Sequence, residues 1–202
     1  KRIAKFKAIA GHGVEAEIEG GRIIFGNSRF MEKENVNTVL IAAQITKLES
    51  QGKTVMILAR KGVLAGVIGV ADTIKDSTVE GVKKLQKMGI ETVMITGDNE
   101  RTAQAIAKQV GISRVLAGIL PEGKEQEVRK IQAEGKIVAM VGDGINDAPA
   151  LAAANVGLAM GSGTDVAIEA ADITLINKDL GTVAAAITLS KRTMRTIKQN
   201  LF

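Results

Sequence analysis

Two aspartates, four residues apart, follow a predicted strand in a pattern that suits a magnesium ion. The strand spans residues 136–141 and runs into a loop that holds Asp143 and Asp147, with glycines at positions 142 and 144 that let the backbone come close. Mg²⁺ in proteins is usually bound by one or two carboxylates, several waters and a substrate phosphate. We therefore expect Asp143, at the strand tip, and Asp147, one helical turn later, to hold Mg²⁺.

Three further residues could bind phosphate. Thr96 and Gly97 follow a predicted strand at 92–95, and they offer a hydroxyl group and an unobstructed N–H to a phosphoryl oxygen. Lys124 lies in the first turn of a predicted helix at 121–133, where its ammonium group is a compact charge with three donors. With the two aspartates, these groups form a set suited to phosphoryl transfer.

Each group also has a plainer explanation when it is taken alone. Gly-Asp-Gly after a strand is most often a turn, Thr-Gly-Asp commonly starts a helix, and a lysine on a helix usually faces solvent. All three occur in this order at or near strand ends, where open α/β sheets bind ligands. Their combination favours the phosphoryl-transfer hypothesis.

The elements that must position these groups alternate between strand and helix from residue 72 onward. This alternation predicts a doubly wound parallel sheet with helices on both faces, an α/β fold. Ser77-Thr78-Val79-Glu80 matches a capping box that opens the first of these helices, which Gly89 closes. The next helix is expected to place residues 103, 106, 107 and 110 inward and to stop at Gly111. Later helices are expected at about 121–133, 148–153, 165–169 and 180 to the end, with strands at 114–117, 136–141, 156–159 and 172–175.

The first part of the chain has a different pattern. Residues 14–18 and 22–25 predict a hairpin that turns at Gly20-Gly21. A helix is expected at 37–50, followed by a strand pair at 54–59 and 63–70. We expect a small α+β part before the α/β part.

Composition excludes several classes of function. The chain has 202 residues, a net charge of +5, only 2% aromatic residues and no cysteine, so it lacks a disulfide framework and stacking residues for nucleic acid. His12 is the single histidine, and no apolar run has the length of a membrane span. The chain opens without Met, and we expect it to be a soluble fragment of a longer protein.

At these residues the chain resembles the P-type ion-transporting ATPases, whose phosphorylation domain has a haloacid-dehalogenase-like fold. Residues 94–99 match the family's Thr-Gly-Asp motif, and residues 141–151 (VGDGINDAPAL) match its most specific signature. Residues 72–75 look like the family's hinge motif, and residues 121–124 look like its lysine motif. The resemblance covers essentially the whole chain.

Within this family the chain is similar to the heavy-metal-transporting branch. Residues 161–167 (GSGTDVA) and 196–202 (TIKQNLF) carry this likeness, and the ending leans toward copper transporters. The resemblance assigns site residues as follows: Mg²⁺ to Asp143 and Asp147; catalysis to Thr96, Gly97, Asp98, Lys124 and Asn146; nucleotide binding to Gly11, His12, Gly13, Gly26 and Asn27; the hinge to Asp72 and Lys75.

The resemblance also implies a pump that binds MgATP and transfers its γ-phosphoryl group to an aspartate. Residues 1–58 would be part of a nucleotide-binding domain and 59–202 a phosphorylation domain, with the hinge near 59–75. The family's Asp-Lys-Thr-Gly-Thr motif is absent here, so we expect the nucleophile upstream and the chain alone to be inactive. The expected partners are ATP, that upstream segment, an actuator domain, transmembrane helices and a heavy-metal ion bound elsewhere.

The last helix predicts a position at the cytoplasmic face of a membrane. It carries Lys191, Arg192, Arg195 and Lys198, and clustered positive charge at a cytosolic membrane boundary follows the positive-inside rule. An ordinary solvated basic helix is the alternative.

Two other hypotheses compete with the pump. The first is a soluble phosphatase of the same fold, which needs an upstream Asp-x-Asp pair, and the second is a non-catalytic nucleotide-binding module.

Overall fold

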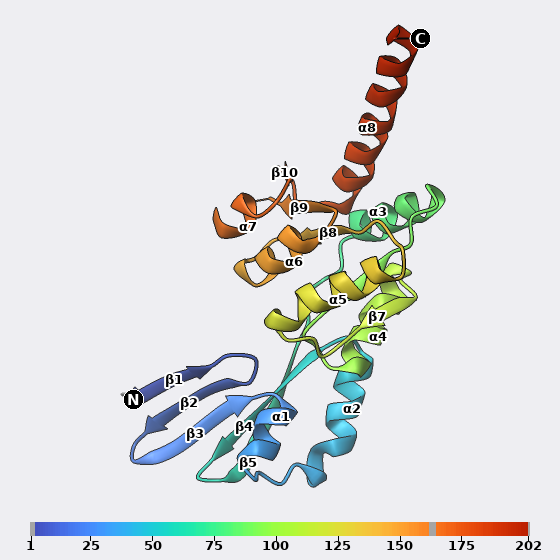
Figure 1. The fold of residues 1–202 in the computed structure, drawn as a ribbon. Coiled ribbons are helices and arrows are strands. Elements are labelled where there is room, and N and C mark those ends of the chain that lie inside the picture. Colours follow the sequence, from blue (N-terminus) through green and yellow to red (C-terminus); the bar gives the residue numbers. More distant parts are fainter. Residues whose placement is uncertain (1–2, 162–164, 202) are drawn as a thin grey trace. The chain divides into compact units, whose positions relative to one another are not determined.

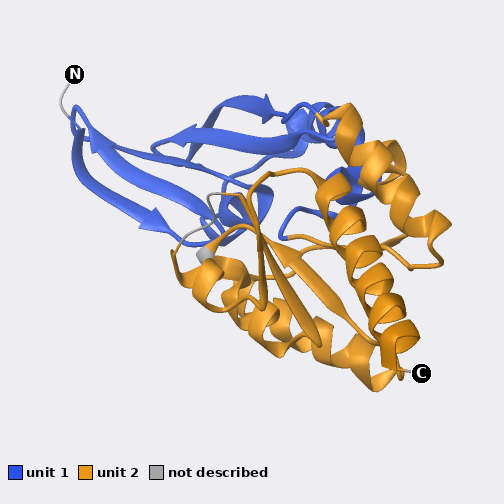
Figure 2. Ribbon diagram, turned by 90° about the horizontal axis from the view of Figure 1, so that it is seen from above, with its two compact units in different colours: residues 1–73, 97–106 blue, residues 74–96, 107–202 orange. Residues whose placement is uncertain are grey.

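A computed structural model describes residues 3–161 and 165–201 and divides the chain into two compact units (Figure 2). Unit 1 comprises Lys1–Thr73 with Gly97–Ile106, and unit 2 comprises Ile74–Thr96 with Ala107–Phe202. The chain thus passes from unit 1 to unit 2 between Thr73 and Ile74, which lie between the expected hinge residues Asp72 and Lys75. The expected domain boundary at 58 and 59 stays a prediction. Residues 162–164 and 202, which contribute to the resemblance, lie outside the described residues.

Unit 1 contains an antiparallel sheet of five strands in the order β1-β2-β3-β4-β5 (Figure 1). The predicted hairpins are present, and each turns through two residues with positive φ, at Glu19-Gly20 and at Lys61-Gly62. The first turn therefore lies one residue before the expected Gly20-Gly21, because Gly21 already pairs with Ile18 in the sheet. Such turns match the twist of the strands that they join. The strands are β1 (Ile3–Ile9), β2 (Gly13–Ile18), β3 (Gly21–Gly26), β4 (Thr54–Arg60) and β5 (Val63–Val70).

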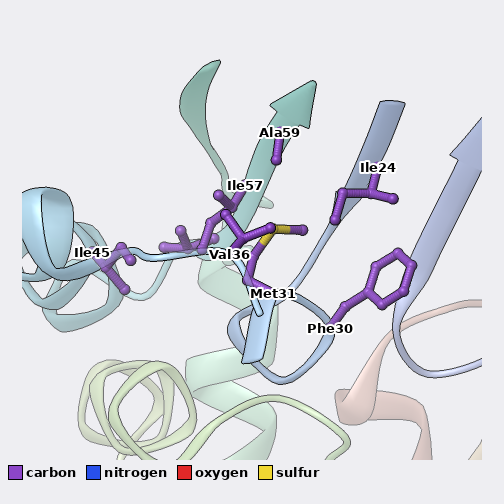
Figure 3. Packing of buried hydrophobic residues seen from close by; sticks show 8 residues of the cluster. Ile24, Phe30, Met31, Val36, Ile45, Ile57 and Ala59 are labelled. Atoms are coloured by element: carbon purple, nitrogen blue, oxygen red, sulfur yellow. The ribbon is translucent and has the colours of Figure 1, made fainter. Parts of the chain in front are cut away.

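The core of unit 1 lies between this sheet and two helices, α1 (Ser28–Lys33) and α2 (Ala42–Ser50). Figure 3 shows Met31 of α1 near Ile57 of β4 and Phe30 of α1 on the side of Ile24 of β3. Phe30, Met31 and Ile57 are fully buried. Burial of each large apolar side chain contributes about 1.5–3 kcal/mol. The short helix α1 was not predicted, and the helix expected at 37–50 begins as a 3-10 turn, η1 (Val39–Ile41).

Unit 2 alternates strands and helices and pairs its strands in parallel, as predicted. The described strands form two hydrogen-bonded groups, β10-β9-β8 and β6-β7. Helix α4 (Glu100–Val110) runs from unit 1 into unit 2. The other elements are α3 (Asp76–Lys87), β6 (Val93–Ile95), β7 (Arg114–Leu116), α5 (Pro121–Ala133), β8 (Ala139–Gly142), η2 (Ile145–Asp147), α6 (Ala148–Ala153), β9 (Val156–Met160), α7 (Asp165–Glu169), β10 (Ile173–Leu175) and α8 (Leu180–Leu201).

Helices cover both faces of the group β10-β9-β8 (Figure 1). On one face, Leu158 of β9 packs with Leu85 of α3 and Val183 of α8. On the other face, α6 comes so close to Gly157 that a Cβ there would lie 2.7 Å from the carbonyl oxygen of Leu151. The doubly wound α/β architecture is therefore confirmed.

Two predicted boundaries in unit 2 are wrong. Helix α3 begins at Asp76 after the extended residue Lys75, and no side chain caps it, so the capping box at residues 77–80 is not formed. Strand β8 begins at Ala139 rather than at residue 136, because β9 begins opposite it at Val156. The preceding residue, Val138, instead binds the loop before β9 through its N–H and its carbonyl group.

Candidate functional site

The loop after β8 folds back so that Asp147 returns to the end of the strand. The N–H of Asp143 donates a hydrogen bond to Oδ2 of Asp147 at 3.3 Å, and the N–H of Asp147 donates to the carbonyl of Gly144 at 3.0 Å. Gly142 permits this return, because a Cβ there would lie 2.6 Å from the Cβ of Asp147. The two expected magnesium ligands thus lie together beyond the carboxyl end of β8.

Lys124 reaches the same loop from α5. The helix starts with Pro121, whose fixed φ suits the first helical position, and Lys124 follows in the first turn. Its Nζ donates to Oδ1 of Asp147 at 2.6 Å, and the two side chains are only 18% and 13% exposed. Because it is partly removed from solvent, this ion pair is screened less than a surface pair.

Lys178, which sequence reasoning missed, contacts the other aspartate. Its Nζ donates to Oδ2 of Asp143 at 2.9 Å, and both side chains are exposed. The signal that could have found it is its position, three residues beyond the end of β10 and therefore near the carboxyl edge of the same sheet.

Two carboxylates and two ammonium groups therefore gather around one loop, and their formal charges cancel. The donor set fits Mg²⁺, because this ion prefers carboxylate oxygens and readily keeps waters and a phosphate as its remaining ligands. Asp143 and Asp147 would hold the ion, which would supply positive charge to a phosphoryl group in transfer. The lysines could bind the oxygens of the same group.

The other expected catalytic residues lie in both units. Thr96 directly follows β6 in unit 2, where its N–H donates to the carbonyl of Leu116 and its carbonyl accepts from the N–H of Ile119. Gly97 and Asp98 belong to unit 1, where Oδ1 of Asp98 accepts a hydrogen bond from the Thr54 hydroxyl at 3.1 Å.

Asn146 is exposed within η2, between the two expected magnesium ligands in sequence. Of the hinge residues, Asp72 lies in the exposed segment after β5, and Lys75 is the residue before α3. The assignments of these residues stay predictions.

The five expected nucleotide-binding residues come together at one end of the unit 1 sheet. Gly11 and His12 form the turn between β1 and β2, and Asn27 follows β3 as the N-cap of α1. The side-chain amide of Asn27 donates to the carbonyl of Gly11 at 2.8 Å, and the backbone N–H of Asn27 donates to the carbonyl of His12 at 2.9 Å. Its Oδ1 also accepts from the N–H of Phe30 at 3.0 Å. A single asparagine thus ties the turn to the start of α1.

Gly13 and Gly26 face each other across β2 and β3, and both positions exclude a side chain. A Cβ at Gly13 would lie 2.2 Å from the carbonyl oxygen of Phe25, and one at Gly26 would lie 2.4 Å from that of His12. The His12 ring packs edge-on against Phe30, with the ring centroids 6.2 Å apart. The glycines therefore have a packing role in addition to any approach of a ligand.

A family model described as haloacid dehalogenase-like hydrolase matches residues 2–155. The chain belongs to the haloacid dehalogenase-like hydrolases. This family membership agrees with the parallel α/β architecture of unit 2 and with a loop after β8 that gathers carboxylates and lysines.

Among sequence relatives of this haloacid dehalogenase-like chain, a copper-exporting P-type ATPase of Bacillus subtilis (strain 168) is 50% identical over 201 residues, which are 100% of this chain and 25% of that protein. A copper-exporting P-type ATPase of Staphylococcus aureus (strain Newman) is 52% identical over 198 residues, which are 98% of this chain and 25% of that protein. The chain thus spans about a quarter of the length of these relatives.

Solved structures of metal-transporting ATPases are also similar. A zinc-transporting PIB-type ATPase in its E2.Pi state aligns with a TM-score of 0.68 and 38% identity over 98% of this chain and 32% of that chain. The catalytic domain of the CPx-ATPase CopB-B, described upon nucleotide binding, aligns with a TM-score of 0.65 and 27% identity over 93% of this chain and 66% of that chain. The resemblance to heavy-metal P-type ATPases is confirmed.

No helix in the described ranges 3–161 and 165–201 has both the length and the apolar character needed to cross a membrane.

Proposed function

We propose that this chain is the nucleotide-binding and phosphorylation region of an ATP-driven pump that exports a heavy-metal ion, with copper the favoured cargo. The names of the sequence relatives support copper, and the similar zinc-transporting structure supports the wider class of metal cations. In the whole pump, the γ-phosphoryl group of ATP would pass to an aspartate carboxylate outside this chain, and ADP would leave.

The observation that carries this proposal is the loop after β8. Asp143 and Asp147 lie within one loop and Lys124 contacts Asp147 at 2.6 Å, so cation ligands and an anion-binding group share one site. A turn or a solvated helix does not require this combination. Phosphoryl transfer requires it, because its catalysis consists mainly of positioning and charge stabilisation.

The chain's own residues would divide the work between the units. In unit 2, Lys124 would bind a phosphoryl oxygen and orient the transferring group, assisted by the hydroxyl of Thr96. The turn at Gly11-His12-Gly13, with Asn27, would hold the nucleotide, and the His12 ring would form one wall of that site.

Helix α8 supports attachment of this region to a membrane protein. Four exposed basic side chains lie in its second half, and the helix contains no acidic residue. None of the four forms an ion pair with any residue that the structure describes. Their charge suits the cytosolic side of a membrane, next to a transmembrane segment of the longer protein.

Radiolabelled ATP tests the location of the nucleophile. The chain is incubated with Mg²⁺ and γ-labelled ATP, quenched in acid, and treated with hydroxylamine, which cleaves acyl phosphates. We expect no label on this chain and hydroxylamine-sensitive label once the preceding part of the longer protein is joined to it. Label on the 202-residue chain itself would contradict the proposal, because an aspartate of this chain would then be the nucleophile.

The magnesium assignment is tested in the longer protein by Asp143→Asn, with Asp165→Asn as the matched control. Asp165 starts the short helix α7 and is also exposed. Asp143→Asn should abolish metal-stimulated ATP hydrolysis, and Asp165→Asn should retain it. Equal ATPase activity in the two variants would refute a role for Asp143.

A further inference from the structure

Lys178 and the candidate magnesium site lie at the same edge of the sheet, beyond the ends of neighbouring strands. The strands lie in the order β10-β9-β8, all parallel, so their carboxyl ends meet at one edge. Asp143 follows β8, Gly161 follows β9, and Lys178 lies three residues beyond β10. Because neighbouring strands are about 4.8 Å apart, the Lys178 side chain must pass the end of β9 to reach Asp143.

Gly161 provides the path for this side chain. A Cβ at its position would lie 2.5 Å from Cγ, 3.4 Å from Cδ and 3.2 Å from Cε of Lys178, so the alkyl chain of the lysine lies directly against the glycine. Gly161 also has a positive φ of 64°, and its N–H donates to the carbonyl of Leu175 at the end of β10. The absence of a side chain at Gly161 thus leaves room for the lysine, whose ammonium group reaches Oδ2 of Asp143 at 2.9 Å.

We propose that Lys178 is a positioning residue that competes with Mg²⁺ for the carboxylate of Asp143 and thereby sets the magnesium affinity of the site. This inference rests on the proposed function, since it takes Asp143 as a magnesium ligand. A divalent cation on Asp143 and an ammonium group 2.9 Å from the same carboxylate repel each other, so binding of the ion displaces Lys178.

The ion pair between Lys124 and Asp147 adds to the competition between lysine and Mg²⁺ at this site. Asp147 is bound by Lys124, so in the described structure each of the two carboxylates has its own lysine, and the site offers no net negative charge to a cation. A bound phosphoryl group would attract both ammonium groups and release both carboxylates. Magnesium binding is therefore coupled to the presence of a phosphoryl anion, and Lys178 contributes to that coupling.

Direct cation binding tests the competition without any turnover. Titration calorimetry with Mg²⁺, and the free-ion paramagnetic resonance signal of Mn²⁺, are measured on the purified chain and its variants. Lys178→Met should tighten cation binding about two- to fivefold, the size expected for the loss of an exposed ion pair. Lys178→Arg, which keeps the charge, should stay close to the wild type. Lys191→Met on α8 is the matched control for net charge and should also leave the affinity unchanged.

Salt and phosphate give two further readouts that a merely structural role would not move. The difference between Lys178→Met and the wild type should shrink at high salt, because exposed charges are screened. Inorganic phosphate should strengthen cation binding more in the wild type than in Lys178→Met.

The outcomes separate the inference from the proposed function. If Asp143→Asn abolishes cation binding while Lys178→Met binds as weakly as the wild type, the magnesium assignment stands and the competition is refuted. If Asp143→Asn binds the cation as well as the wild type does, the assignment of Asp143 is refuted, and the inference falls with it. Circular dichroism of each variant confirms that the fold is retained.

Discussion

Replacement of Gly26 by alanine should destabilise unit 1 far more than the same replacement elsewhere in its sheet. Gly26 ends β3, and an added Cβ would lie 2.4 Å from the carbonyl oxygen of His12 and 2.6 Å from Cδ1 of Phe30. The first contact is with backbone, which cannot rotate away. The methyl group must therefore push β2 and β3 apart at the turn where the five expected nucleotide-binding residues meet.

The magnitude follows from the two interactions that are disturbed. Separation of the strands breaks the hydrogen bond from the Asn27 N–H to the His12 carbonyl, a loss of about 1 kcal/mol. Overpacking against Phe30, which is fully buried, adds about 1–3 kcal/mol. We expect Gly26→Ala to lower the free energy of unfolding by about 2–4 kcal/mol, a large share of the roughly 5–15 kcal/mol typical of a domain.

Gly66 on β5 is the matched control, because it lies in the same sheet, lacks a positive φ and has no atom within 4 Å of the position that an added methyl group would occupy. Gly66→Ala should change the free energy of unfolding by less than about 0.5 kcal/mol. Urea unfolding followed by circular dichroism measures both values. Equal stability of the two variants would refute the close approach of β2 and β3. Under the proposed function, Gly26→Ala should also weaken ATP binding, and Gly66→Ala should not.

Three further predictions use side-chain replacements in unit 1. Phe30→Ala should cost about 3–5 kcal/mol because Phe30 is fully buried, whereas Phe6→Ala, at 63% exposure, should be nearly neutral in the same urea assay. Thr102 is also fully buried and its hydroxyl donates to a backbone carbonyl, so Thr102→Val should cost about 1–3 kcal/mol and Thr102→Ser clearly less; equal costs would argue against that hydrogen bond. Arg22 donates a hydrogen bond to Glu15 and holds the pKa of that carboxyl below its usual value, so the pair stabilises the fold above about pH 4.5 and is lost as pH falls through the lowered pKa. Arg22 also pairs with Glu34 at 2.6 Å, so Arg22→Gln removes both ion pairs. It should lower the free energy of unfolding at neutral pH by under about 1 kcal/mol for each of these partly exposed pairs, and its difference from the wild type should shrink in acid.

Much of the fold could be predicted because its patterns are local. Alternation and paired turn residues predict the hairpins of unit 1, and apolar periodicity with a closing glycine predicts α3 and α4. Helix α5 begins at Pro121 as expected, since proline suits a first helical turn. Helix α1 was missed because six residues show too little periodicity, although Asn27 is a typical N-cap.

The candidate site was predictable only in part. Asp143, Asp147 and Lys124 follow strand ends or start a helix, so their approach to one another could be expected from topology. The position of Lys178 just beyond β10 indicates the same sheet edge, but its contact with Asp143 also depends on the path beside Gly161, which the sequence pattern does not show. The start of β8 was misplaced for a related reason, since a strand extends only as far as its neighbour pairs with it.

Helix α8 has a consequence for local stability along the chain. It contains 22 residues, a length of about 33 Å at 1.5 Å per residue, yet only Val183 and Ala184 are buried, and every residue described from Thr188 onward is exposed (Figure 1). Helical segments shorter than about 12–15 residues are marginal in water without packing. Amide hydrogens near Val183 should therefore exchange with solvent slowly, and those beyond Ser190 should exchange progressively faster toward Leu201. The gradient of amide protection along α8 would therefore mark where the helix stops packing against the rest of unit 2.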